Sequence, residues 1–427
     1  MKRILIRGGM TPFENYDAPN TMLYNPIGNN SGNMLYVYSV VRAIYTSEEI
    51  RIDADHYVPE SRHPLTDEEM DRINEQYDLY VLPLANAFRY KLRFVLQRLT
   101  DFINRLKIPV ILIGIGVSQE HEDGPNATYR NDDTVRAFIR AVLGKSSVIG
   151  TRGEITRDYL VHLGFQAETD VTAIGCPSAY TFGPDIHIRA PELGGEAKLL
   201  INKNPKAPEQ VRQFLRRTAG KHKNAFVIQQ TKKELMEMFL GCPYNGSPQD
   251  ESQKRFFLNM PAWFEFTGDA GLSVGSRLHG NVVPTLGGTP SVFIPIDIRM
   301  RELVDYHDYA SVDPAEVKGT RTYSLRKLLE HCDFQAFERR QPENFAHYLA
   351  FLKKNQVETI YDNGQRPARG DTSFDRKIAE IQFEEPVLSS VMCDEKQIKK
   401  RWSKFEGTLR AAQIPLRAWI DEKSREE

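Results

Sequence analysis

Short apolar runs alternate with longer amphipathic segments along most of the chain. The runs have the length of buried strands, and the longer segments repeat apolar residues at helical spacing. This alternation is typical of β-α units around a parallel sheet. It predicts these elements in the first part of the chain: strands at residues 4–6, 79–84, 110–117 and 147–151, and helices at residues 30–44, 90–106, 134–143 and 154–163.

Prolines and glycines interrupt the alternation between residues 176 and 196, which suits a linker between domains. Beyond this linker the same pattern resumes, with strands predicted at residues 198–201, 225–229, 272–274 and 291–296, and helices at residues 208–219, 232–240 and 281–286. After residue 306 the pattern is mainly helical, most clearly at residues 323–330 and 344–357. The last fifty residues have the pattern of charged surface helices, which suits docking or self-association.

We therefore expect an α/β protein in three parts. These are an N-terminal Rossmann-like domain (residues 1–190), a C-terminal Rossmann-like domain (191–310) and a helical C-terminal extension (311–427). Two Rossmann-like domains facing across a cleft make a GT-B-like arrangement, in which ligands bind at the carboxyl ends of the strands. Other two-domain α/β folds share this periodicity, so the motifs have to distinguish them.

Composition narrows the classes of function. The chain has 56 Lys and Arg against 57 Asp and Glu, so no bulk field attracts nucleic acid and any anion site must be local. No apolar run approaches the roughly 20 residues that cross a bilayer. The first residues predict a strand and not a signal peptide, so we expect a cytoplasmic protein. The cysteines lack paired or metal-ligand spacing, so we expect reduced thiols and neither a metal nor another cofactor; they are Cys176, Cys242, Cys332 and Cys393.

The most informative stretch is Ser-Arg-Leu-His-Gly at residues 276–280, which follows an apolar strand and precedes a helix. In an extended segment Arg277 and His279 point to the same side, which brings a permanent cation and a titratable imidazole together at a strand end. Gly280 lets the backbone approach a ligand, and the following helix offers free N–H groups to a phosphate. An Arg–carboxylate pair beside a surface histidine has the same two residues, but the strand, glycine and helix context favours a ligand site.

A second arginine occupies a similar position. Arg152 falls at the end of a predicted strand and just before a helix, where a guanidinium and backbone N–H groups meet an anion together. A structural ion pair at the domain edge fits this spacing equally well. Arg157, one turn further along, is more typical of a solvated partner of Asp158 or Glu154.

Small polar residues precede the first helix of the N-terminal domain. Asn30, Gly32 and Asn33 are suited to bind a phosphate or a sugar hydroxyl, although ordinary helix capping needs the same residues. The segment Gly114-Ile115-Gly116 follows a strand and predicts a tight turn that lines the cleft.

Together these motifs resemble the polysaccharide pyruvyl transferase family. The resemblance rests on residues 30–33, 114–116, 151–154, 175–178 and, most specifically, 276–280 with Gly288-Thr289-Pro290. It implies a GT-B-like fold and transfer of the enolpyruvyl unit of phosphoenolpyruvate to a hydroxyl of a polysaccharide or its precursor, forming a pyruvate ketal. It also implies that Arg152 and Arg277 hold the phosphate and carboxylate of the donor and that His279 is the acid–base group.

The predicted site residues follow from both arguments. We expect His279 and Arg277 to be catalytic; the expected substrate-binding residues are Arg152, Asn30, Gly32, Asn33, Gly116, Ser276, Gly280 and Arg299. Asn33 stands where the family commonly has aspartate, and an amide cannot take a proton. Arg299 follows the strand where the family often has a Tyr-x-x-Lys-like element, so either Arg299 supplies that positive charge or the acceptor differs.

Two alternatives remain open from the sequence. A nucleotide-sugar glycosyltransferase of GT-B type would use the same arginines, with Glu302 or Asp305 as its ribose-binding carboxylate. A non-catalytic sugar- or phosphate-binding relative is favoured by Asn33. The basic, aromatic segments at residues 88–91 and 399–402 are more typical of solvated helix faces than of a membrane contact. The sequence leaves peripheral membrane contact and oligomerisation open.

Overall fold

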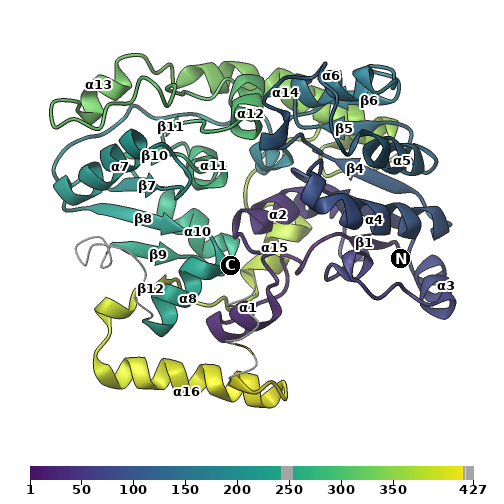
Figure 1. Cartoon of the computed structure of the whole chain (residues 1–427), viewed down its shortest axis with the longest axis horizontal. Helices are drawn as coiled ribbons and strands as arrows, with labels where there is room; N and C mark the ends of the chain where they lie inside the picture. The colour runs from purple at the N-terminus through teal and green to yellow at the C-terminus, as the bar shows by residue number, and fades with distance from the viewer. Residues whose placement is uncertain (242–252, 417–418, 420–427) are drawn as a thin grey trace.

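The computed structural model describes residues 1–241, 253–416 and Trp419, and contains two halves that lie side by side, each built on a parallel sheet (Figure 1). In the first half the strand order is β2-β1-β3-β4, and all neighbours are parallel. The strands are β1 (Arg3–Ile6), β2 (Arg51–Ala54), β3 (Leu79–Pro83) and β4 (Val110–Ile113). A parallel pair, β5 (Ile149–Thr151) and β6 (Val171–Ala173), continues beyond β4 through a bridge between Ile115 and Thr151.

The described residues of the first half form six α-helices: α1 (Ala18–Tyr24), α2 (Gly32–Ile44), α3 (Asp67–Gln76), α4 (Arg93–Arg105), α5 (Asp132–Leu143) and α6 (Glu154–His162). Helix α1 packs against helices from later in the chain, at residues 232–240 and 395–411. Helix α4 buries one face through Leu96, Leu99 and Ile103, which recur at helical spacing. Helix α2 is different, because nearly all of its residues are buried. It lies between the two halves and packs against both (Figure 1).

The second half contains a sheet with the strand order β11-β10-β7-β8-β9-β12. Its strands are β7 (Leu199–Asn202), β8 (Ala225–Gln229), β9 (Lys254–Phe256), β10 (Leu272–Gly275), β11 (Ser291–Phe293) and the antiparallel edge strand β12 (Val387–Leu388). Its helices are α7 (Glu209–Lys221), α8 (Lys232–Leu240), α10 (Met260–Thr267), α11 (Leu278–Leu286) and α12 (Ile298–His307).

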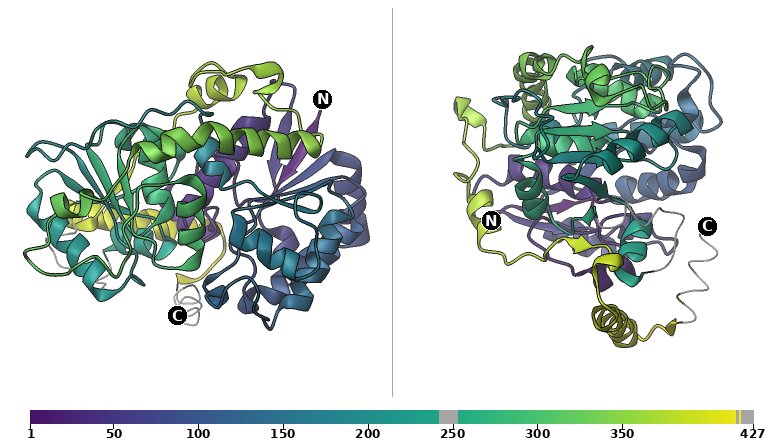
Figure 2. Two further views of the ribbon diagram at one scale, coloured as in Figure 1. Left: turned by 90° about the horizontal axis from the view of Figure 1, so that it is seen from above. Right: turned by 90° about the vertical axis from the view of Figure 1, so that its left-hand side faces the viewer.

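The C-terminal part of the chain packs on both halves. Its helices are α13 (Leu325–Leu329), α14 (Gln335–Lys354), α15 (Ser373–Ala379) and α16 (Glu395–Ala411). Helix α14 runs across the boundary between the halves (Figure 2). Gln341 Nε2 donates to the Ala179 carbonyl at 2.6 Å, and Asn355 Nδ2 donates to the Val148 carbonyl at 3.0 Å, both in the first half. Since β12 completes the second sheet, this part of the chain connects the two halves. The division at residues 190 and 310 stays a prediction.

A buried ion pair fixes one of these connections. Arg42 of α2 is fully buried, and its Nε and Nη2 donate to the Asp375 carboxylate at 2.9 and 2.8 Å. Its Nη1 donates to the Thr181 carbonyl and to the Tyr361 hydroxyl. Because a buried charge is stable only with a partner and full hydrogen bonding, Arg42 requires α15 in place.

The predicted α/β class and GT-B-like pairing of two parallel α/β units are confirmed. Strand β8 and helix α8 begin and end at the predicted residues. The pattern missed β2, α3, β9 and α10, and it placed the start of the helix after β10 at residue 281, whereas α11 begins at Leu278.

The structure also leaves Cys176, Cys332 and Cys393 as free thiols, while Cys242 lies outside the described residues. None of the described helices is long and apolar enough to cross a bilayer.

Candidate functional site

Loops from the carboxyl ends of strands in both halves meet at the N-terminus of α2. The first half contributes the segments that follow β4 and β5, and the second half contributes the segment that follows β10. Hydrogen bonds join the two sides: Ser31 N donates to the Gln230 carbonyl at 2.8 Å, and Lys232 N donates to the Asn29 carbonyl at 3.2 Å. In parallel α/β sheets this edge is where ligands bind.

Arg152 lies at the centre of the first-half side and is only 3% exposed. Its backbone N–H donates to the Ile115 carbonyl at 2.9 Å, which holds β5 beside the loop after β4. Its side chain crosses Gly116 so closely that a Cβ at that position would lie 2.3 Å from Arg152 Cδ. Nη1 donates to Asn86 Oδ1, whereas Nε is buried with no partner among the described residues. Gly116 is therefore needed for the position of Arg152.

His279 comes from the second half and lies against the start of α2. A Cβ on Gly32 would lie 2.3 Å from His279 Nδ1. On its other side, His279 Nε2 is 3.5 Å from Ser178 Oγ and 4.0 Å from Cys176 Sγ. Burial, together with the positive charge of Arg152, lowers the pKa of His279 to about 3. The structure thus brings His279 and Arg152 together, with the imidazole neutral at pH 7.

The expectation that Arg277 and His279 share one side of an extended segment is wrong. Helix α11 begins at Leu278, so Arg277 is its N-cap and His279 is already helical. The Arg277 side chain is 6% exposed; its Nε donates to the Lys203 carbonyl and its Nη2 to Glu234 Oε1, both at 2.6 Å. Arg277 therefore forms a structural ion pair with the first turn of α8, while its Nη1 is buried and unpartnered in the described part of the chain.

Other predicted residues make hydrogen bonds that shape the backbone. Asn30 Oδ1 accepts from Gly32 N at 2.8 Å, and Ser276 Oγ accepts from Asn204 N at 3.0 Å. Asn33 Nδ2 donates to the carbonyls of Ile27 and Gly28 at 2.9 and 3.2 Å. A carboxylate could not donate to these carbonyls, so the amide at position 33 stabilises the loop before α2.

The remaining predicted residues lie beside the same loops. Gly280 packs directly against the side chains of Asn202 and Gln230, which leave no room for a Cβ. Arg299, at the start of α12, forms an ion pair with Asp297. Arg157 pairs with Asp158, as expected.

Glu302 occupies a position that the sequence did not indicate. Its Oε1 accepts from Thr156 N at 2.6 Å and its Oε2 from Thr156 Oγ1 at 2.9 Å, at the N-terminus of α6. Burial raises the pKa of this carboxyl to about 7. Both oxygens are occupied inside the protein, so Glu302 is not available to a ribose, while Asp305 is exposed.

Comparison with models of protein families identifies the family of this chain. The model of the polysaccharide pyruvyl transferase family matches residues 30–298, which is more than half of the chain. The chain belongs to this family. It is therefore a transferase, and the matched region contains both Arg152 and His279 and ends just before Arg299.

Solved structures and curated proteins add little to this pyruvyl transferase assignment. Methanocaldococcus jannaschii UDP-GlcNAc 2-epimerase, crystallised with UDP-GlcNAc and UDP, is 10% identical with a TM-score of 0.39, covering 88% of this chain and 97% of its own. Anabaena HepE in complex with UDP-glucose is 13% identical with a TM-score of 0.38, covering 89% and 99%. At these scores the likeness carries no conclusion about function. No curated protein matches the chain.

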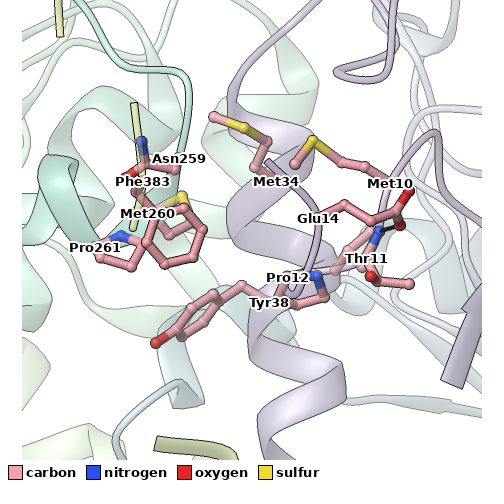
Figure 3. Close-up of a pocket in the computed structure, with 11 residues that line it drawn as sticks. Met10, Thr11, Pro12, Glu14, Met34, Tyr38, Asn259, Met260, Pro261 and Phe383 are labelled. Atoms are coloured by element: carbon pink, nitrogen blue, oxygen red, sulfur yellow. Dashed lines mark hydrogen bonds between the residues drawn. The ribbon is translucent and has the colours of Figure 1, made fainter. Parts of the chain in front are cut away.

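The pyruvyl transferase also has cavities away from this site. Figure 3 shows a small one between α2 and the start of α10, about 20 Å³ in volume and suited to about one water molecule. A larger cavity of about 410 Å³ lies between α6, β6, α12 and α14. None of the predicted site residues lines either cavity. Among the described residues, no group of three or more His, Cys, Asp or Glu is placed to hold a metal ion.

Proposed function

We propose that the protein transfers the enolpyruvyl unit of phosphoenolpyruvate to a sugar of a polysaccharide or its precursor, forming a pyruvate ketal. The proposal rests on the position of Arg152 and His279 at the same loops, one from each half, with the charge of Arg152 acting on the imidazole. An arginine with an unused buried donor suits an anionic substrate, and an adjacent imidazole suits proton transfer to and from it.

The reaction balances without an oxidant or reductant. The donor methylene carbon takes a proton, one sugar hydroxyl forms a C–O bond to the adjacent carbon and loses its proton, and the C–O bond to phosphate breaks. A second hydroxyl of the same sugar then closes the ketal and loses its proton. One proton remains in the methyl group and one leaves with the phosphate as hydrogen phosphate.

His279 is the proposed acid–base group. In the free protein, burial and the charge of Arg152 hold the pKa of His279 at about 3, so the imidazole is neutral. A donor anion beside Arg152 would offset that charge and raise the pKa of His279 toward neutrality, where an imidazole both gives and takes a proton. Substrate binding thereby prepares His279 for catalysis.

The other residues have supporting roles in this proposal. Arg152 holds the donor, and Gly32 and Gly116 allow His279 and Arg152 to lie against the backbone. Arg277 positions the start of α11 through Glu234 and does not act on the substrate. The structure favours neither a ribose site at Glu302 nor a loss of catalysis through Asn33. We retain the cytoplasm as the proposed location.

Phosphate release tests the proposal. Protein, phosphoenolpyruvate and oligosaccharides with neighbouring free hydroxyls should release phosphate and give a product with the mass of the ketal. His279→Gln should lower kcat by about 10²–10⁴-fold, whereas His162→Gln, at the exposed end of α6, should leave it unchanged. Full activity of His279→Gln would overturn the acid–base assignment. Transfer from a nucleotide sugar and not from phosphoenolpyruvate would overturn the proposed reaction.

A further inference from the structure

Arg89, in the segment between β3 and α4, lies close to Arg152. Asn86, in the left-handed region with φ of 48°, accepts the hydrogen bond from Arg152 Nη1. Two residues later Phe88 is fully buried and pairs with Val117, and its carbonyl accepts from Ser118 Oγ at 3.2 Å. Since Gly116 lies directly beneath Arg152, this attachment places Arg89 beside Arg152.

Arg299 reaches the same place from the second half. The start of α12 is held to the first half because Ile298 N donates to Glu122 Oε1 at 2.9 Å. One turn later, Glu302 accepts both hydrogen bonds from Thr156, in the helix that follows Arg152. Arg299 therefore lies between two fixed points of α12 that both contact the first half.

Positive charge exceeds negative charge at this place. Burial and then the charges of Arg299 and Arg152 lower the pKa of Arg89, as expected for like charges held close together. Asp297 pairs with Arg299, and Glu120 Oε2 accepts from Tyr90 N at 2.7 Å. The Arg89 side chain makes no hydrogen bond or ion pair with any described residue, and its Nε is buried, like that of Arg152. An anion with several oxygens would satisfy both donors and relieve the repulsion.

We propose that Arg89, Arg152 and Arg299 form one site for a small organic anion that carries a phosphate monoester and a second anionic group. The proposal rests on the proposed function and deepens it, since it makes Arg89 a donor-binding residue and leaves Arg277 out of the donor site. The carboxylates near the three guanidinium groups already have other partners: Asp297 pairs with Arg299, Glu120 accepts from Tyr90 N, and Glu302 accepts from Thr156. A ligand with two anionic groups would supply acceptors to the donors that remain on Arg89 and Arg152.

Calorimetric titration of the full chain with phosphoenolpyruvate tests the site. Arg89→Gln and Arg299→Gln should each weaken binding about 10–100-fold, the range for losing a hydrogen bond to a charged group. Arg89→Lys should recover part of the affinity, because it restores the charge but not the fork geometry. In turnover, Arg89→Gln should raise the KM for phosphoenolpyruvate and leave kcat within about threefold, since Arg89 binds the donor without touching His279.

Arg93→Gln is the matched control. Arg93 lies four residues further along, over the exposed rings of Tyr90 and Phe94, and its substitution should leave donor affinity within about twofold. Melting temperatures of all variants should stay near that of the parent protein, and if Arg89→Gln does not fold, Arg299→Gln and Arg89→Lys carry the test.

The outcomes separate this inference from the proposed function. Unchanged binding of phosphoenolpyruvate in both Arg89→Gln and Arg299→Gln would overturn the three-arginine site while leaving pyruvyl transfer intact. A protein that binds UDP-glucose and not phosphoenolpyruvate, with the same dependence on Arg89, would overturn pyruvyl transfer while supporting an anion site at these arginines. A parent protein that binds neither compound would overturn both.

Discussion

Two buried histidines, His279 and His307, are held neutral by their surroundings. His279 lies beside Arg152, and His307 is fully buried, with its Nε2 accepting from Cys176 N at 2.9 Å. Burial is the main cause that lowers the pKa of each to about 3. His307 must therefore carry its proton on Nδ1, and protonating either ring costs free energy of folding.

This predicts how stability depends on pH. The unfolded chain binds a proton at position 279 near pH 6.5, whereas the folded protein does not until about pH 3. The stabilisation is therefore complete above pH 6.5 and is lost as pH falls toward 3, at no more than about 1.4 kcal/mol per pH unit for one group. Denaturant unfolding between pH 7 and 4.5 should show the parent protein losing stability faster than His279→Gln.

His162→Gln is the control for this measurement, because His162 is exposed. Its free energy of unfolding should run parallel to that of the parent protein across the same pH range. A constant difference between the parent protein and His279→Gln would show that His279 titrates normally in the folded state.

At the scale of elements, one carboxyl joins two helices. Glu302 on α12 accepts two hydrogen bonds from Thr156 in the first turn of α6, the helix that follows Arg152. Glu302→Ala removes the acceptor of the Thr156 N–H and of its hydroxyl hydrogen, although the hydroxyl oxygen still accepts from Val117 N. The substitution should therefore lower the free energy of unfolding by about 1–3 kcal/mol. Thermal unfolding would measure this, and no change would mean that water replaces the carboxyl.

Glu302→Gln removes the titratable charge of Glu302 while keeping a side chain of the same size beside Thr156. Burial raises the pKa of Glu302 from 4.5 to about 7, so the folded protein keeps a proton that the unfolded chain has lost between these pH values. The contribution of Glu302 to stability therefore falls as pH rises from 4.5 to 7. Glu302→Gln should accordingly gain stability relative to the parent protein over that range, which is the opposite slope to that of His279.

Elements were predictable where a periodic pattern and an end signal agreed. Helix α8 has the expected bounds because Thr231 and Glu234 form a capping box at its start. Strand β9 was missed because it is short and carries Lys254 and Arg255, and α11 was placed too late because its first turn contains His279 and Gly280. At such positions the local sequence is a weak signal, and tertiary packing determines the secondary structure.

The candidate site was predictable only in part. The strand, glycine and helix context together with the family resemblance indicated Arg152 and His279, and the structure brings them together. The role of Arg277 depends on Glu234, 43 residues away in the sequence, and no local pattern connects them. Arg89 was missed because the basic and aromatic residues at positions 88–91 predicted a solvated helix face, whereas the structure buries Phe88.

At the scale of the whole molecule, the Arg42–Asp375 pair joins the first half to the C-terminal part of the chain. Burial alone would raise the pKa of the Asp375 carboxyl. The hydrogen bonds and the charge of Arg42 outweigh burial, so the pKa of Asp375 is lowered. Asp375→Ala leaves Arg42 buried without an anion and should cost about 3–5 kcal/mol of unfolding free energy. Urea unfolding would measure this loss.

Two further variants test whether the lost stability comes from leaving the buried charge of Arg42 unpaired. Arg42→Met combined with Asp375→Leu should recover most of it, because apolar groups replace the pair without leaving a buried charge. Asp185→Asn, which breaks the exposed pair with Arg366, should change stability by less than about 1 kcal/mol. If Asp375→Ala were as mild as Asp185→Asn, the C-terminal part would not be held by this pair.

The distance along the chain between Arg42 and Asp375, 333 residues, has a consequence for biosynthesis. A nascent polypeptide emerges from the ribosome with its first sheet long before the carboxylate that must neutralise Arg42, and multidomain chains generally fold unit by unit during translation. The early intermediate thus has to keep that guanidinium hydrated. Its final consolidation waits until almost the entire polypeptide has been made, and a ribosome that stalls before that point leaves an incompletely closed product for the cell's quality control.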